Sequence, residues 1–217
     1  MHTHTHAHTR THTHTHTQVY VNRGQVSGSP FSVMIQSGEV FTFEEAFDKK
    51  GVLYHLATHG GTSAYSNPHS SNRVVASLCS IQNGCPTRFV QGPSHDGQSN
   101  HTKNEANSWM AVDLKHHLAP SHYCLRTDAY NGHYKLHNWR VEGSKDGASW
   151  TCLREHVNGS SLATTPFSVA AWPIDNAAAA HFRHFRILQT GPNSDRNYHL
   201  MCAGIEVYGR LGAGELT

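Results

Sequence analysis

Alternating apolar and polar positions dominate the chain from residue 39 onward. Residues 138–142, reading Asn-Trp-Arg-Val-Glu, have the period of two expected of a strand that buries one face. Residues 144–147, reading Ser-Lys-Asp-Gly, then supply a turn, because the Asp side chain bonds its own backbone and Gly accepts a positive φ. A second run starts with Trp-Thr-Cys at residues 150–152. The pattern predicts a hairpin that places two Trp side chains in the core of a β-sandwich.

Similar short runs recur along the rest of the chain. In the run 109–114, the odd-numbered residues, beginning with Trp109, fall on one face and the even-numbered residues on the other. Long polar loops separate the runs, and helical periodicity is almost absent, so the pattern predicts an all-β, antiparallel sandwich. The other predicted strands are residues 52–56, 74–77, 122–126, 171–173, 182–189 and 201–209, and the longest loops are residues 58–72 and 80–107.

The first 38 residues have a different character. Residues 2–17 alternate His and Thr with two interruptions, and no hydrophobic residue larger than Ala is present, so we expect a disordered tail. Such a tract could bind soft divalent ions loosely, or be a low-complexity stretch without function. Residues 18–38 contain two short β patterns and read as a linker or edge strand. Residues 212–217 form a short tail.

Composition narrows the classes of function. At 217 residues the chain can hold one sizeable domain or two small ones. The net charge is +2 with His neutral, and no basic cluster indicates nucleic-acid binding. No long apolar run is present, which excludes a membrane-spanning helix, and the first residues do not read as a signal peptide. We therefore expect an intracellular, cytoplasmic location.

The cysteines agree with that expectation. Their number is odd, which in the absence of a signal peptide favours free thiols in a reducing compartment. Three of them fall within strand-like runs, where Cys behaves as a small hydrophobic residue. These three are Cys124, Cys152 and Cys202, and the other two are Cys79 and Cys85.

Two motifs bear on catalysis or metal binding. Cys79, Cys85, His95 and His101 are spaced more loosely than the usual zinc sites with two Cys and two His, so we expect ordinary loop residues. The phrase His-Gly-Gly at residues 59–61 resembles part of a hydrolase oxyanion hole, but the chain has no Gly-x-Ser-x-Gly elbow. No glycine-rich phosphate loop is present. We expect a protein without catalytic activity and without a cofactor.

Five motifs, taken in order, resemble the coagulation factor V/VIII type C (discoidin) domain, a galactose-binding-like jelly roll. The resemblance covers about residues 41–210 and implies a domain over residues 39–211. The motifs are SWMAVDL (108–114), SHYCLRTD (121–128), LHNWRVEGSKDGASW (136–150), FRHFRILQTGPN (182–193) and AGIEVYG (203–209). In addition, GQVSGSPFSVMI (24–35) resembles the last two strands of a filamin-type repeat, which implies that the chain is part of a longer protein.

The resemblance is strongest to the intracellular branch of the discoidin family, which occurs in HECT-type ubiquitin ligases and BTB-domain proteins. The stretch FDKKGVLYHLAT (47–58) carries this likeness together with SHYCLR (121–126). Secreted members typically carry a disulfide that joins the two ends of the domain. No Cys precedes Cys79 and none follows Cys202, which is a departure from the secreted pattern. The resemblance implies a non-catalytic binding module.

Ligands of this fold are generally met by loops at one end of the sandwich, so the resemblance points to residues 58–72, 91–107 and 126–136. Tyr side chains give rigid amphipathic contacts at low entropic cost, and an Arg beside them could anchor a carboxylate. Alternatively, one Tyr packs under its loop and the Arg pairs internally. The candidate ligand-binding residues are Arg126, Tyr130, Asn131, His133, Tyr134, Tyr65 and Asn67.

Three functions follow as hypotheses. The first is a protein–protein interaction module within an intracellular scaffold or ubiquitin-ligase-type protein. The second is an adhesion module that binds a carbohydrate or a lipid headgroup, which would require export. The third, more remote, is a zinc- or thiol-dependent enzyme. Nothing in the sequence requires more than a monomer.

Overall fold

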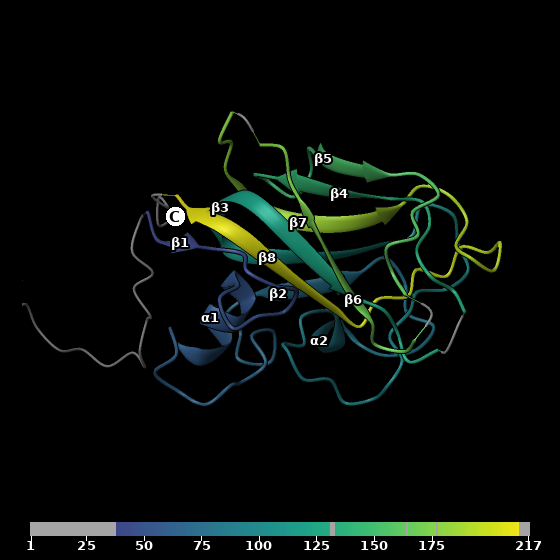
Figure 1. Cartoon of the computed structure of the whole chain (residues 1–217), viewed down its shortest axis with the longest axis horizontal. Coiled ribbons are helices and arrows are strands. Elements are labelled where there is room, and N and C mark those ends of the chain that lie inside the picture. The colour runs from purple at the N-terminus through teal and green to yellow at the C-terminus, as the bar shows by residue number, and fades with distance from the viewer. Residues whose placement is uncertain (1–37, 131–132, 164, 177, 213–217) are drawn as a thin grey trace, which may run out of the picture. The chain divides into compact units, whose positions relative to one another are not determined.

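The computed structural model describes residues 38–130, 133–163, 165–176 and 178–212. The His/Thr tract and the filamin-like stretch lie outside these ranges. Strands dominate, and both helices are short (Figure 1). In chain order the elements are β1 (Val40–Phe41), α1 (Val52–Thr58), β2 (Val75–Leu78), α2 (Pro86–Phe89), β3 (Trp109–Arg126), β4 (Trp139–Ser144), β5 (Thr151–His156), β6 (Val169–Pro173), β7 (Phe182–Gln189) and β8 (Gly204–Leu211).

Strand β3 holds the fold together because it belongs to both layers. Its first part, up to Asp113, pairs with β2 and β7. Its second part, from Leu118, pairs with β8 and β6, and Leu118 itself also pairs with Phe182 on β7. Strand β4 continues the first layer between β7 and β5, and β1 continues the second layer beside β8. Every pairing is antiparallel. The predicted all-β, antiparallel sandwich is therefore confirmed.

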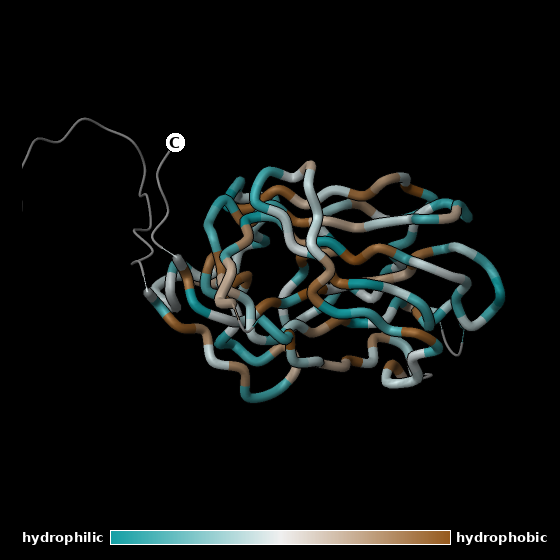
Figure 2. Tube along the Cα trace, turned by 90° about the horizontal axis from the view of Figure 1, so that it is seen from above, coloured by the Kyte–Doolittle hydropathy of each residue, from teal (hydrophilic) through white to brown (hydrophobic). Residues whose placement is uncertain are grey.

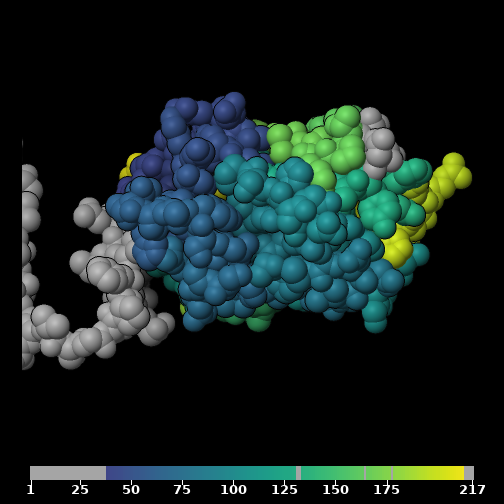
Figure 3. Space-filling model, turned by 90° about the horizontal axis from the view of Figure 1, so that it is seen from below, coloured from purple at the N-terminus to yellow at the C-terminus, as the bar shows by residue number. Residues whose placement is uncertain are grey.

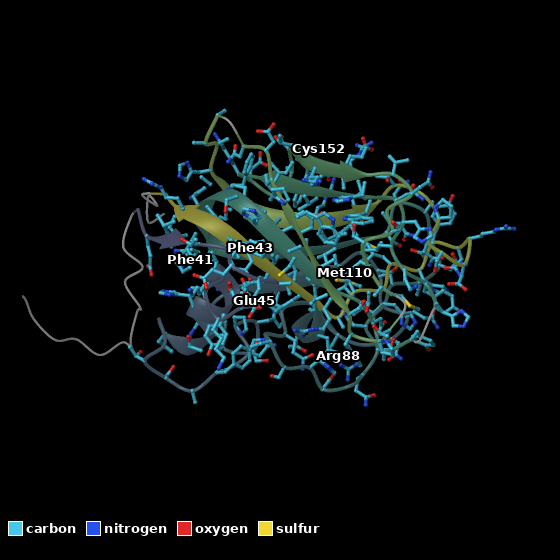
Figure 4. The ribbon with its side chains drawn as sticks, in the orientation of Figure 1. Phe41, Phe43, Glu45, Arg88, Met110 and Cys152 are labelled. Carbon is cyan, nitrogen blue, oxygen red and sulfur yellow. The ribbon has the colours of Figure 1, made fainter. Side chains whose placement is uncertain are left out.

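The core lies between the two layers. Met110 on β3, Trp139 on β4 and Phe185 on β7 are completely buried, and Met110 lies in the middle of the strands in Figure 4. The run 109–114 has two different faces, as predicted: the even-numbered face points inward, while Trp109 on the other face stays partly exposed. In Figure 2, hydrophobic and hydrophilic positions interleave along the chain through the body of the molecule. Alternation with period two thus builds the interior.

The predicted hairpin is β4 and β5. Asp146 accepts hydrogen bonds from the backbone N–H groups of Ala148 (2.9 Å) and Ser149 (2.8 Å), and Gly147 has φ +75°. These bonds hold the pKa of Asp146 down at about 2. One detail differs from the prediction. Trp150 stays half-exposed on the outer face, where the Arg186 guanidinium lies 4.1 Å from the centre of its ring.

Residues 52–56, predicted as a strand, are the start of helix α1, so this prediction is wrong. A short apolar run is compatible with either element, and the tertiary structure decides. The Glu206 carboxylate on β8 accepts hydrogen bonds from the N–H groups of Leu53 (2.7 Å) and Tyr54 (2.9 Å), which caps the first turn. The helix ends at Thr58, and His59 follows as its C-cap with φ +50°. Helices α1 and α2 lie on one face of the molecule, which the blue and teal residues cover in Figure 3.

The runs 109–114 and 122–126, predicted as separate strands, are the two ends of the continuous 18-residue strand β3. The strand bends between them. Lys115 has φ +58°, and its N–H donates to the Asp113 carboxylate at 2.7 Å. A second irregularity in the pairing with β8 follows at Pro120, which fits because Pro occurs in strands at such irregularities. The local sequence pattern does not show that the two runs belong to one strand, because the residues at the bend do not form a recognisable turn sequence.

Cys152 does not behave as a small core residue, in contrast to the prediction. It is exposed on β5, near the edge of the molecule in Figure 4. Cys124 and Cys202 are buried as predicted, and all five cysteines are free thiols. Neither described helix is long and apolar enough to cross a membrane.

Candidate ligand-binding surface at the loop end

Two loops meet at the end of the sandwich opposite β1. They follow β3 and β7, and both lie on the side of Figure 1 away from the C-terminus. Lys135 and Ser194 join the loops through two hydrogen bonds of 3.0 Å, one between backbone groups and one to the Ser194 hydroxyl. Asp195 accepts two more, from the His133 ring (Nδ1, 2.9 Å) and from the Tyr134 N–H. These four bonds fix the loop after β3.

Four aromatic rings pack in a closed circuit at this end, and we call them the aromatic quartet: His101, Tyr130, Tyr134 and His199. Neighbouring ring centres lie 5.6–5.9 Å apart, and neighbouring rings are inclined by 77–88°. This edge-to-face geometry is the one that aromatic quadrupoles favour. Tyr130 is the most accessible member, with 43% of its surface exposed. The quartet thus presents one Tyr ring to solvent on a packed aromatic support.

A buried carboxylate anchors the quartet from below. Asp128 accepts hydrogen bonds from the Ser99 hydroxyl (2.8 Å) and the Asn100 N–H (2.9 Å), and the His101 ring nitrogen lies 3.6 Å from it. The Ser99 hydroxyl also lies 2.8 Å from that ring nitrogen. Buried polar groups with these partners hold one geometry. The surface is therefore rigid beneath its exposed ring.

Electrostatics also hold the loop in place. Burial opposes ionisation of Asp195, but the hydrogen bonds from His133, the Tyr134 N–H and Ser194 outweigh burial, so the pKa of Asp195 lies below its ordinary value. Tyr134 has φ +55°, which is uncommon for a residue with a side chain. The carboxylate of Asp195 thus stabilises a backbone conformation that the sequence does not favour locally.

The predicted residues Arg126 and Tyr65 lie in a second group, around residues 92 and 93. Arg126 is only 3% exposed, donates to the Pro93 carbonyl at 3.0 Å, and lies 4.2 Å from the centre of the Phe47 ring. Burial lowers its pKa. The Tyr65 hydroxyl accepts a hydrogen bond from the Gly92 N–H at 2.7 Å. Both side chains brace a loop from within.

Asn67 is engaged in its own loop. Its side-chain oxygen accepts hydrogen bonds from the N–H groups of His69 (3.0 Å) and Ser70 (3.2 Å), and its amide donates to the Thr87 carbonyl at 2.9 Å. Asn131 lies outside the described residues. Of the seven predicted residues, the structure brings together Tyr130, His133 and Tyr134. A ligand-binding role for the seven stays a prediction.

Sequence reasoning missed the partners that position those three residues. The chain has 21 His residues, so the presence of a His at position 101 or 199 did not by itself indicate a binding site. Asp128 and Asp195 had no local pattern to mark them. The signal that pointed to this region was the resemblance, which implied loops at one end.

The four Cys and His residues with loose zinc-site spacing have separate contacts. His95 stacks on Phe167 with ring centres 3.7 Å apart, and the Cys85 thiol lies 2.8 Å from the Thr87 hydroxyl. The Cys79 sulfur accepts from the Trp109 N–H at 3.2 Å. Across the part of the chain that the structure describes, no group of three or more His, Cys, Asp or Glu residues could hold a metal ion.

Comparisons with known proteins point to one branch of one domain type, although no protein-family model matches the sequence. The chain is 34% identical over 181 residues to the E3 ubiquitin-protein ligase Ufd4 of Drosophila melanogaster. It is 32% identical over 174 residues to the E3 ubiquitin-protein ligase hecd-1 of Caenorhabditis elegans, and 30% identical over 177 residues to a BTB/POZ domain-containing protein of Arabidopsis thaliana. The matches cover 81%, 76% and 75% of this chain, but only 7%, 6% and 21% of those proteins.

Solved structures agree on the fold. A carbohydrate-binding module of Clostridium perfringens, solved in complex with GalNAc-β-1,3-galactose, has a TM-score of 0.51 at 12% identity and covers 64% of this chain and 96% of its own. A fucolectin from striped bass serum (Morone saxatilis) has a TM-score of 0.51 at 13% identity, with 65% and 47% covered. The chain is a galactose-binding-like β-sandwich of the discoidin type. Over three quarters or more of its length it is similar in sequence to segments of ubiquitin ligases and of a BTB-domain protein, which agrees with the predicted resemblance.

Proposed function

We propose that this domain is a non-catalytic binding module that contacts a protein partner through the loop end, as part of a larger ubiquitin-ligase-type protein or scaffold. The observation that carries the proposal is the exposed Tyr130 ring on the rest of the aromatic quartet. Tyr is enriched at protein interfaces because it offers apolar area and a hydrogen-bonding hydroxyl at low entropic cost. The buried Asp128 network supports this role, because a rigid surface loses little entropy on binding.

The relatives support the setting of the module. Two of them are E3 ubiquitin-protein ligases, and this chain spans only 6–7% of their length. A short domain of this kind is suited to serve as one recognition module of a long protein. We infer an intracellular, cytoplasmic location, a monomeric domain over residues 39–211, and a linker or filamin-type end before it. The five free thiols are in keeping with a reducing compartment.

The non-catalytic assignment is supported by the state of the buried thiols. Burial raises the pKa of both Cys124 and Cys202 to about 12. A nucleophilic cysteine needs a lowered pKa, because the thiolate is the reactive form. These two thiols are therefore structural.

Carbohydrate or lipid-headgroup binding at the loop end is the second candidate. It is favoured by the likeness in fold to a module solved with a bound disaccharide. The aromatic quartet could stack against a sugar as well as against a protein side chain, so a binding experiment has to distinguish the two ligand classes.

The test uses the full chain as bait, with Tyr130→Ala as the loop-end variant and Val40→Ala as the control. Val40 is 54% exposed on β1, at the other end of the sandwich. Partners found by cross-linking and mass spectrometry would be purified and titrated by calorimetry. We expect a partner whose affinity falls at least about tenfold in Tyr130→Ala and is unchanged in Val40→Ala. Equal affinity for both variants, or retention on a glycan or lipid array without a protein partner, would overturn the proposal.

A further inference from the structure

A groove of about 420 Å³ lies on the outer face of the first layer. Strands β2, β3 and β7 form its floor, and the turn between β4 and β5 forms one wall. The indole rings of Trp109 and Trp150 line it and stay half-exposed, and Val75, which also lines it, is 42% exposed. The aromatic quartet does not line it, so the groove is separate from the loop-end surface. Apolar groups exposed in a hollow are typical of a surface that a partner covers.

The Arg186 guanidinium is held in the groove by two neighbours. Its Nε donates to the Glu142 carboxylate at 2.6 Å, and its central carbon lies 4.1 Å from the centre of the Trp150 ring. Its Nη1 and Nη2 groups make no hydrogen bond to any residue that the structure describes, and 20% of the side chain is exposed. A guanidinium that is fixed in place and keeps N–H groups open is a preorganised donor.

The open hydrogen-bonding groups along the groove are mostly donors. Besides Arg186, the indole N–H groups of Trp109 and Trp150 have no partner within the described ranges. Asp113 also lines the groove, but both of its carboxylate oxygens already accept from the Arg183 guanidinium, at 2.7 and 2.9 Å. The groove therefore suits a ligand that is rich in hydrogen-bond acceptors.

Charge narrows the kind of acceptor. An anionic oxygen gains more than a neutral one from the open N–H groups of Arg186, because charge-assisted hydrogen bonds are stronger. A doubly charged phosphate would lie beside the carboxylates of Glu142 and Asp113, which repel it. Burial lowers the pKa of His184, so this lining residue is neutral and does not offset the repulsion. A carboxylate, with one charge and two acceptor oxygens, fits Nη1 and Nη2 best.

We propose that this groove docks an acidic linear segment of a partner protein. One Glu or Asp carboxylate of the segment binds Nη1 and Nη2 of Arg186, and a neighbouring apolar side chain covers Trp109. Backbone carbonyls of the segment accept from the indole N–H groups. A small free carboxylate would supply the charge but would leave the exposed indoles in water. This proposal does not depend on the loop-end function.

The probes are octapeptides with acetylated and amidated ends, each with one central Glu between apolar residues, and the same set with Gln in place of Glu. Intrinsic fluorescence of the full chain follows binding at about pH 7.5, where an unperturbed His is neutral. Trp139 and Trp172 are buried, so a blue shift on binding reports the covering of Trp109 and Trp150. We expect at least one Glu peptide to bind with a Kd of about 100 μM or tighter. Its Gln counterpart should bind at least about tenfold more weakly.

The variant that tests the site is Arg186→Gln combined with Glu142→Gln, because Arg186→Gln alone would leave Glu142 buried without its partner. The double variant should weaken the Glu peptide at least about tenfold. The matched control is Arg140→Gln combined with Glu155→Gln. This second Arg–Glu pair is joined through Nε at 3.0 Å but does not line the groove, so the affinity should stay unchanged.

Ser77→Tyr is a second groove variant, because a bulky side chain on β2 should fill the groove without removing a charge. Circular dichroism would confirm the fold of each variant. Tyr130→Ala, at the loop end, should bind the Glu peptide as the parent chain does. The proposal is overturned if no Glu peptide binds, if the Gln peptides bind equally well, or if both groove variants bind as the parent does. It is also overturned if succinate binds as tightly as the best peptide, or if phosphoserine in place of Glu raises the affinity.

Discussion

Glu206 shows at the scale of one residue how a buried carboxyl group links distant parts of the chain. It lies almost wholly buried on β8, and its carboxylate accepts hydrogen bonds from the N–H groups of Leu53, Tyr54 and Val207 at 2.7–3.0 Å. Burial disfavours the charged form, while the three N–H groups favour it. Burial prevails and raises the pKa of Glu206 from 4.5 to about 8.

The raised pKa predicts a specific dependence of stability on pH. Between pH 4.5 and 8 the unfolded chain loses the Glu206 proton while the folded chain keeps it, so the free energy of unfolding falls as the pH rises. Glu206→Gln should remove this decline. It should also cost about 1–3 kcal/mol at pH 5, because an amide N–H₂ group faces an N–H donor. Urea unfolding between pH 5 and 8 measures both effects. Glu105→Gln, at an exposed position, is the control, and an unchanged slope in Glu206→Gln would contradict the assignment.

The lowered pKa of His156 predicts that the free energy of unfolding also falls on the acidic side. Its ring stacks on Trp139 with centres 4.0 Å apart, and its Nε2 lies 2.6 Å from the Tyr123 hydroxyl. Burial, helped by Arg154, lowers the pKa of His156 from 6.5 to about 4. As the pH falls from 6.5 to 4, His156 becomes protonated in the unfolded chain but stays neutral in the folded chain, so the free energy of unfolding decreases. His156→Phe keeps the stacking and should reduce the loss between pH 6.5 and 4 in urea unfolding; an acid limb identical to that of the parent chain would refute this reading.

At the scale of elements, the pairing of β3 with β8 depends on one close approach. Gly209 has φ +148°, and a Cβ placed there would lie 2.1 Å from the Ala119 carbonyl oxygen. Gly209→Ala should therefore destabilise the domain by about 3 kcal/mol or more, through strain and a clash with backbone. Gly97→Ala is the matched control: it also has positive φ (+74°), but no atom lies within 4 Å, so it should cost only about 1 kcal/mol. Thermal unfolding would compare the two, and equal losses would show that φ alone decides.

At the scale of the whole molecule, the cysteines report how tightly the sandwich closes. Cys79 and Cys152 are exposed, Cys85 is half-buried, and Cys124 and Cys202 lie inside. A thiol reagent should modify the two exposed cysteines quickly in the native chain, Cys85 more slowly, and the two buried ones only at the rate of unfolding. All five should react in urea without reductant. Peptide mapping after timed labelling measures this, and fast labelling of Cys124 or Cys202 would mean that the core opens readily.

The fold was largely predictable because its signals are local. The period of two around Trp139, the Asp146-Gly147 turn and the inward face that carries Met110 depend on residues that are near neighbours in sequence. The candidate site was predictable only in part. The chemistry of Tyr130, His133 and Tyr134 predicts a binding role and the three lie together, but the residues that hold them in place come from elsewhere in the chain.

The sequence by itself thus determined the class of fold, the hairpin and the loops that could meet a ligand, since side-chain alternation and turn chemistry act over a few residues. The tertiary structure decided the rest. Residues 52–58 became a helix because Glu206, 153 residues after Leu53, supplies the cap for its first turn. The aromatic quartet and the groove beside Trp109 arise where side chains from three or more separate segments converge. Such convergence follows from packing between distant segments, and no local pattern records it.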